Sequence, residues 1–135
     1  MGPLDKDVVR DDALRSTADG CALEIRSHWY RALPLTSLAV VDLALDGEPV
    51  ERSALTVEAN GKTHAFDDLE RLDDEWWFTT DAVTLHVPRE GIVAGTEHRV
   101  ELDLGLSIPY LIIRRGAERQ PLLASSRTDK TVVCG

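Results

Sequence analysis

The stretch from Val100 to Ile108 alternates apolar and polar residues without interruption. Successive side chains of an extended strand point to opposite faces, so this period of two predicts a strand with one buried and one solvated face. A helix would scatter the apolar residues around its axis. The predicted buried set is Val100, Leu102, Leu104, Leu106 and Ile108, and the opposite face contains Arg99, Glu101 and Asp103. Gly105, in the middle of this strand, predicts a bulge or a close backbone approach.

The same period recurs in four shorter segments. Asp46-Gly47 and Asn60-Gly61 follow two of them, and both pairs favour two-residue hairpin turns because they tolerate a positive φ. The predicted apolar faces are Cys21, Leu23, Ile25 and Trp29; Ala39, Val41, Leu43 and Leu45; Leu55, Val57 and Ala59; and Val83, Leu85 and Val87.

These segments predict an all-β protein. We expect an antiparallel β-sandwich of about seven to eight short strands, with at most one or two short helical turns. Asp67 to Leu72 is one candidate turn, because acids suit the start of a helix. We divide the 135 residues into an N-terminal extension (1–20), the sandwich core (21–115) and a C-terminal tail with room for one further strand (116–135).

Charge and cysteine content narrow the functional classes. The formal net charge of −9 disfavours nucleic acid and anionic membranes as partners. Cys21 and Cys134 are far apart in the sequence, which favours free thiols in a reducing compartment. The charged N-terminus does not resemble a secretory signal, and the chain contains no apolar run long enough to cross a membrane. We therefore expect a cytoplasmic protein.

The sequence offers little catalytic chemistry. Its four histidines, His28, His64, His86 and His98, lack the spacing of a metal motif. A general acid would need a carboxyl group in apolar surroundings that raise its pKa, and Glu75, beside Trp76, is the one weak candidate. We expect no catalytic residue, metal or cofactor in this chain.

Two aromatic patches stand apart from this pattern. "SHWY" contains Trp29 and Tyr30, and "EWWF" contains Trp76 and Trp77. Neighbours in a strand point to opposite faces, so each pair should give one ring to the core and one to the surface. We expect Trp29 and either Trp76 or Trp77 in the core. Exposed aromatic residues are enriched at the centres of interfaces, so the predicted partner-contact set is Tyr30, Trp76, Trp77, Pro109 and Tyr110, with one of the two tryptophans excluded by burial.

At these patches the chain resembles a known family. The segments "EIRSHWYRALPLTSL", "DGEPV", "DDEWWF" followed by "VTLHVP", and "LDLGLSIPYL" occur in this order in the small β subunit of bacterial C-glycoside deglycosidases. The resemblance runs from about Cys21 to Leu111.

The resemblance implies a complex of two chains. The α subunit would be an isomerase-like (β/α)8 barrel that carries a divalent metal, Mn or Mg, and the acid and base residues. The β subunit would be an accessory, non-catalytic β-sandwich beside the barrel mouth. The complex would be a lyase that breaks the C–C bond between a 3-keto sugar and an aromatic aglycone such as a flavonoid, with the 3-keto-C-glycoside bound at or near the subunit interface.

Two other hypotheses remain open at the level of sequence. The chain could be a stand-alone β-sandwich that binds a carbohydrate or an aglycone, with its outward aromatic residues as a stacking platform. It could also be a structural domain without a ligand. A neighbouring gene for an isomerase-like barrel would favour the subunit hypothesis over both.

Overall fold

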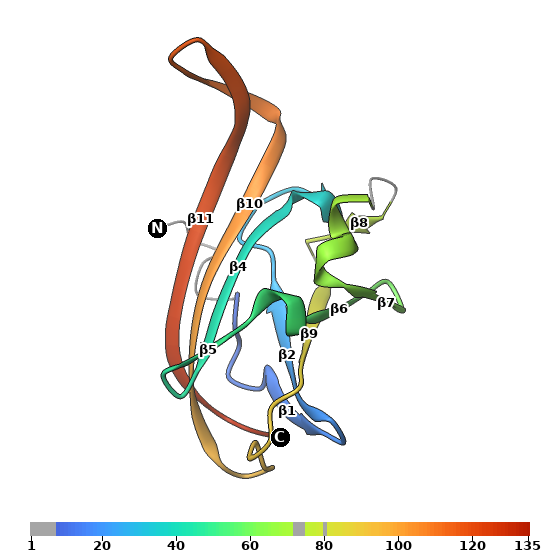
Figure 1. The fold of residues 1–135 in the computed structure, drawn as a ribbon, viewed down its shortest axis with the longest axis vertical. Coiled ribbons are helices and arrows are strands. Elements are labelled where there is room, and N and C mark those ends of the chain that lie inside the picture. The colour runs from blue at the N-terminus through green and yellow to red at the C-terminus, as the bar shows by residue number, and fades with distance from the viewer. Residues whose placement is uncertain (1–7, 72–74, 80) are drawn as a thin grey trace.

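A computed structural model of the chain describes residues 8–71, 75–79 and 81–135. Strands dominate the described residues, and every strand pair is antiparallel. Two sheets face one another as layers (Figure 1). The first has the order β1-β2-β9-β6-β7, and the second has the order β11-β10-β4-β5. This confirms the predicted all-β sandwich.

The strand boundaries are as follows. The five-stranded sheet contains β1 (Leu14–Thr17), β2 (Gly20–Arg26), β9 (Ala82–Val87), β6 (Thr56–Ala59) and β7 (Lys62–Ala65). The four-stranded sheet contains β11 (Glu118–Val133), β10 (Glu97–Arg115), β4 (Leu38–Leu45) and β5 (Glu48–Val50). A small separate sheet pairs β3 (Leu33–Pro34) with β8 (Trp76–Trp77).

Helical structure is limited to short 3-10 turns in the described part of the chain. These are η2 (Leu35–Ser37), η3 (Arg52–Ala54) and η4 (Phe66–Arg71). The predicted turn at Asp67 to Leu72 corresponds to η4, with Leu72 itself outside the described residues. The sequence predicted at most two such turns, and neither η2 nor η3 was singled out by it.

The core lies between the two sheets. All five apolar residues of the alternating stretch of β10 are buried there, as predicted: Val100, Leu102, Leu104, Leu106 and Ile108. The facing sheet contributes side chains such as Leu23, Val57 and Leu85. Burial of this apolar area is the main stabilising term of the fold.

Both predicted hairpin turns are present. Asn60 and Gly61 have φ angles of 54° and 76° and join β6 to β7, and Asp46 and Gly47 have φ angles of 53° and 82° and join β4 to β5. Positive φ at both central residues matches the right-handed twist of the flanking strands.

The predicted face of β4 is wrong at one residue. Ala39 is exposed, whereas Leu38 is buried. The register against β10 shifts here, because Gly105 pairs with Val40 but Leu106 pairs with Leu38. This β-bulge inserts Ala39 as an extra residue and reverses the alternation beyond it. Gly105 therefore marks a bulge, as predicted.

The number and length of the strands also differ from the prediction. The structure has eleven strands in its described part, and β10 and β11 contain 19 and 16 residues. These two strands form one long hairpin whose tip projects past the other strands (Figure 1). The sequence suggested shorter strands because Pro109 and Pro121 interrupt the pattern and β11 is mostly polar.

Both ends of the described chain contribute to the sandwich. Val8, Val9 and Leu14 are buried from within residues 1–20, and Val132 and Cys134 are buried from within residues 116–135. Cys21 and Cys134 are both free and buried. Burial raises the pKa of the Cys21 thiol to about 11, so that this side chain remains a neutral thiol at ordinary pH.

Candidate partner-binding surface

The segment that contains Trp29 and Tyr30 begins where β2 ends. Residues 28–31 make a bend, in which Tyr30 is 65% exposed and Trp29 is half-buried against the core. The prediction that Trp29 continues the apolar face of a strand is therefore wrong, because β2 stops at Arg26. The bend lets both rings of the pair approach the surface.

Contacts tie this bend to β10. The Trp29 indole Nε1 donates a hydrogen bond to the Tyr110 hydroxyl, and the rings of Trp29 and Tyr30 lie 5.1 Å apart. The Arg31 guanidinium lies over the Tyr110 ring, 5.0 Å from its centroid, within range of a cation–π interaction. We call Trp29, Tyr30, Arg31 and Tyr110 the aromatic patch.

An irregularity in β10 places Tyr110 at this point. Ile108 pairs with Leu122 and Ile112 pairs with Pro121, so residues 109–111 have no partner on β11. Pro109 has no N–H to donate to the ladder, which is consistent with a break in pairing there. The break leaves Tyr110 and Leu111 exposed.

The tryptophan pair of β8 divides between surface and core, as alternation predicted. Trp76 is 45% exposed, whereas Trp77 is 2% exposed and its indole Nε1 donates to the Asp81 carbonyl at 3.0 Å. Trp77 is therefore a core residue and leaves the predicted contact set. Phe78, which the sequence did not single out for the surface, is exposed.

The structure brings only some of the predicted contact residues together. Tyr30 and Tyr110 meet through Trp29, with Pro109 adjacent in the chain. Trp76 lies on β8, opposite Pro34 of β3, and its carbonyl accepts a hydrogen bond from Asn60 at 2.9 Å. Among the described residues, no ring contact or hydrogen bond joins Trp76 to the aromatic patch. The exposed aromatic residues thus form two groups.

Glu75 does not have the environment of a general acid. Its carboxylate accepts hydrogen bonds from Lys62 and from Asn60. The hydrogen bond from Lys62, followed by that from Asn60, lowers the pKa of Glu75. The hypothesis of a raised pKa at Glu75 is therefore wrong, and this carboxylate instead anchors the turn beside Trp76.

A second polar cluster was not predicted from the sequence. His98 Nδ1 lies 2.6 Å from Asp46 Oδ2, and His98 Nε2 lies 2.7 Å from Thr96 Oγ1. This order of groups resembles a nucleophile, a base and an orienting acid. However, the Thr96 hydroxyl donates its proton to the Val93 carbonyl oxygen, which can only accept. That proton is therefore not available for transfer to His98. The cluster therefore stabilises the turn at Asp46. His98 and Asp46 are 52 residues apart in the sequence, so no local pattern predicts their contact.

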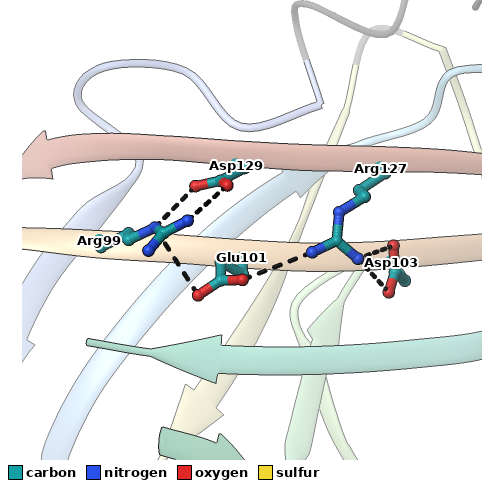
Figure 2. Close-up of polar contacts among 5 residues, drawn as sticks. All are labelled: Arg99, Glu101, Asp103, Arg127 and Asp129. Atoms are coloured by element: carbon teal, nitrogen blue, oxygen red, sulfur yellow. Dashed lines mark hydrogen bonds and ion pairs between the residues drawn. The ribbon is translucent and has the colours of Figure 1, made fainter. Parts of the chain in front are cut away.

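The outer face of the β10–β11 hairpin carries a ladder of ion pairs (Figure 2). Arg99 binds Asp129 through two hydrogen bonds of 2.9 and 2.7 Å, and Arg127 binds Asp103 at 3.0 and 3.1 Å. Glu101 lies between the two arginines, 3.7 Å from Arg99 and 3.4 Å from Arg127. The predicted polar face of β10 is thus at the surface, with its charges internally matched.

A shallow groove of about 570 Å³ lies elsewhere, on the five-stranded sheet. Its lining combines apolar residues such as Ala54, Val87 and Pro88 with three threonines and His86. The Nε2 atom of His86 lies 2.9 Å from Glu58 Oε1. No phenylalanine, tyrosine or tryptophan is among its described lining residues. The groove and the exposed aromatic residues therefore do not form one site.

Within the described ranges, no group of three or more histidine, cysteine, aspartate or glutamate side chains is arranged to hold a metal ion. No helix in the same residues has the length and apolar character needed to cross a bilayer.

Comparison with known proteins decides the family. A profile of the C-glycoside deglycosidase beta subunit family matches residues 4–110, most of the chain. The chain belongs to this family. The matched region includes β1 to β9, the bend at Trp29 and Tyr30, and β10 as far as Tyr110, so it covers both groups of exposed aromatic residues.

Individual members of the family agree with this assignment. A C-glycoside deglycosidase beta subunit of Microbacterium trichothecenolyticum is 36% identical over 93% of this chain and 92% of its own length. One of Arthrobacter globiformis is 38% identical over 74% of this chain and 77% of its own. A 3'-dehydrocarminate deglycosidase beta subunit of a Microbacterium species is 32% identical over 77% of this chain and 78% of its own. The beta-subunit designation implies a partner α subunit.

Proposed function

We propose that this chain is the accessory β subunit of a C-glycoside deglycosidase, and that its exposed aromatic residues bind the α subunit. The observation that carries the proposal is family membership over residues 4–110, together with a relative that matches across 93% of the chain. The surface supports it, because Tyr30, Trp76 and Tyr110 present large apolar rings to solvent in the isolated chain. Burial of such rings is a common source of binding energy at interfaces.

The proposed reaction is cleavage of the C–C bond between a 3-keto sugar and an aromatic ring. The name of the Microbacterium relative, a 3'-dehydrocarminate deglycosidase subunit, fits a substrate whose sugar has been oxidised. The keto group acidifies the proton on sugar C2, and loss of that proton allows the ring to leave from C1 as the ring carbon is protonated. A divalent metal, Mn or Mg, in an isomerase-like (β/α)8-barrel α subunit would stabilise the enolate.

The role of this chain in that reaction is structural. The aromatic patch is held by the Trp29–Tyr110 hydrogen bond and by Arg31 above the Tyr110 ring. A surface ordered before binding loses less side-chain entropy on association. We propose that this surface packs beside the mouth of the barrel and helps to exclude water from the substrate there.

The alternative of a stand-alone sugar-binding module has less support. A stacking site needs an aromatic face beside a polar pocket. Here the groove near His86 and Glu58 has no phenylalanine, tyrosine or tryptophan in its described lining, and the exposed rings of these types lie elsewhere.

Turnover measurements test the proposal. The chain, its α subunit and their mixture should be assayed for release of the aglycone from a 3-keto-C-glucoside. We expect turnover by the mixture and none by this chain alone. Turnover by the purified chain without the α subunit would contradict the accessory role.

A further inference from the structure

The far end of the β10–β11 hairpin lacks support from the rest of the sheet. Strand β4 pairs with β10 only as far as Leu106, so the hairpin beyond it has no third strand among the described residues. Figure 1 shows this end as a two-stranded ribbon that projects from the sandwich. Isolated two-stranded ribbons are marginally stable in water. We call residues 109–123 the arm.

One face of the arm combines apolar and basic side chains. Alternation along β11 places Arg119, Pro121 and Leu123 on one face, and their partners Ile112 and Arg114 lie on the same face. Ile112 is 54% exposed and Leu123 is 46% exposed. This outer face of the arm is continuous with the face that carries the ion-pair ladder.

The charges of the arm are arranged differently from those of the ladder. Arg114 lies directly opposite Arg119 in the pairing register. Within the described ranges, neither arginine forms an ion pair with an acid, whereas Arg99 and Arg127 of the ladder are both paired with carboxylates (Figure 2). Like charges directly opposite one another destabilise a strand pair. The chain as a whole is acidic, with 24 acidic and 15 basic residues, whereas this end is basic. An acidic partner surface would neutralise the two arginines.

We propose that the outer face of the arm is a docking element for an acidic surface of the α subunit with an apolar centre. Ile112, Pro121 and Leu123 fill the apolar centre, and Arg114 and Arg119 pair with carboxylates of the partner. This inference rests on the proposed subunit role. It extends the contact surface from the aromatic patch, which shares Tyr110 with the base of the arm, and assigns the partner surface a negative charge.

Charge reversal tests the inference. The double variant Arg114→Glu/Arg119→Glu keeps two like charges opposite one another, so the internal repulsion of the arm is unchanged while its sign is inverted. Its affinity for the α subunit should fall by about tenfold or more at low salt, and the loss should shrink at about 0.5 M salt because screening weakens the charge term. Calorimetric titration of the α subunit at both salt concentrations measures the effect.

Arg10→Glu/Arg15→Glu is the matched control. Both residues are exposed and lie in or near β1, and this variant changes the net charge equally. Its affinity should remain within about twofold of that of the parent chain, because only the arm makes the proposed charge contact. Equal losses for the two double variants would assign the effect to net charge and overturn the inference.

The remaining outcomes separate the two proposals. If the parent chain fails to bind the α subunit, the proposed subunit role fails. If the parent chain binds and the arm variant binds equally well with unchanged thermal stability, the arm inference fails while the subunit role stands. If the chain alone forms a dimer that the arm variant cannot form, the occupant of the arm is a second copy and the inference is overturned.

Discussion

At the scale of single residues, the two tryptophans of β8 have opposite roles. Trp77 is buried in the core, so Trp77→Ala should lower the free energy of unfolding by about 3–5 kcal/mol. Trp76 is exposed, so Trp76→Ala should change stability little but weaken binding of the α subunit by about 2 kcal/mol, roughly thirtyfold. Urea unfolding of the isolated chain and titration of the α subunit measure the two effects. Unchanged affinity for Trp76→Ala would remove this residue from the interface.

The carboxylate of Asp46 makes the stability of the fold depend on pH. The hydrogen bond from His98 lowers the pKa of Asp46 from its ordinary value of 3.8. A carboxyl group with a lowered pKa in the fold stabilises the fold above its unfolded pKa, and this contribution is lost as the pH falls through the folded value. The melting temperature of the parent chain should therefore fall more steeply below about pH 4 than that of Asp46→Asn.

The Asp46→Asn substitution should change the charge at this position without changing the backbone. Asparagine tolerates the φ of 53° at this turn position, so the variant should keep the β4–β5 hairpin. Identical acid dependence of the two proteins would show that the ionised carboxylate of Asp46 does not contribute to stability.

At the scale of elements, the close approach of β4 and β10 depends on a glycine. A Cβ atom at Gly105 would lie 2.8 Å from Val40 Cβ, which belongs to a branched side chain with little freedom to move. Gly105→Ala should therefore destabilise the fold by about 1–3 kcal/mol through overpacking. Ser107→Ala, two residues further along the same face, is the control and should have a small effect. Unfolding free energies of equal size would disprove the overpacking argument.

Individual elements show how far the sequence predicts this fold. Strict alternation predicted the buried face of β10, and the Asn-Gly and Asp-Gly pairs predicted their turns, because these features depend on local backbone geometry. Alternation also predicted that Trp76 and Trp77 point to opposite sides. Their assignment to surface and core required the structure, since either register satisfies the same local pattern.

The features that sequence reasoning missed depend on distant partners. Ala39 is displaced by a bulge that exists only against Gly105 and Leu106 of β10. Strand β11 is mostly polar and is recognisable only once it is paired along β10. His98 contacts Asp46, which is 52 residues away in the sequence, so no local spacing predicts the contact. The candidate surface was half predicted, because the contacts of Trp29 with both Tyr30 and Tyr110 depend on a bend after β2.

At the scale of the whole molecule, the fold is a sandwich with one well-packed interior and several apolar groups left outside it. Tyr30, Trp76, Phe78 and Tyr110 are exposed, and the arm adds Leu111, Ile112 and Leu123. The chain belongs to the C-glycoside deglycosidase beta subunit family, and the proposed function assigns these groups to contact with a second chain. The internally matched ladder of Figure 2 has no such requirement.

The central claim is that this chain assembles with an α subunit through these exposed groups. Sedimentation velocity of the chain, of the α subunit and of their mixture tests it most directly. We predict that the mixture sediments as a larger species that contains both chains, and that Trp76→Ala and Arg114→Glu/Arg119→Glu reduce the amount of that species. Separate sedimentation of the two parent chains at concentrations that support full turnover would contradict the account.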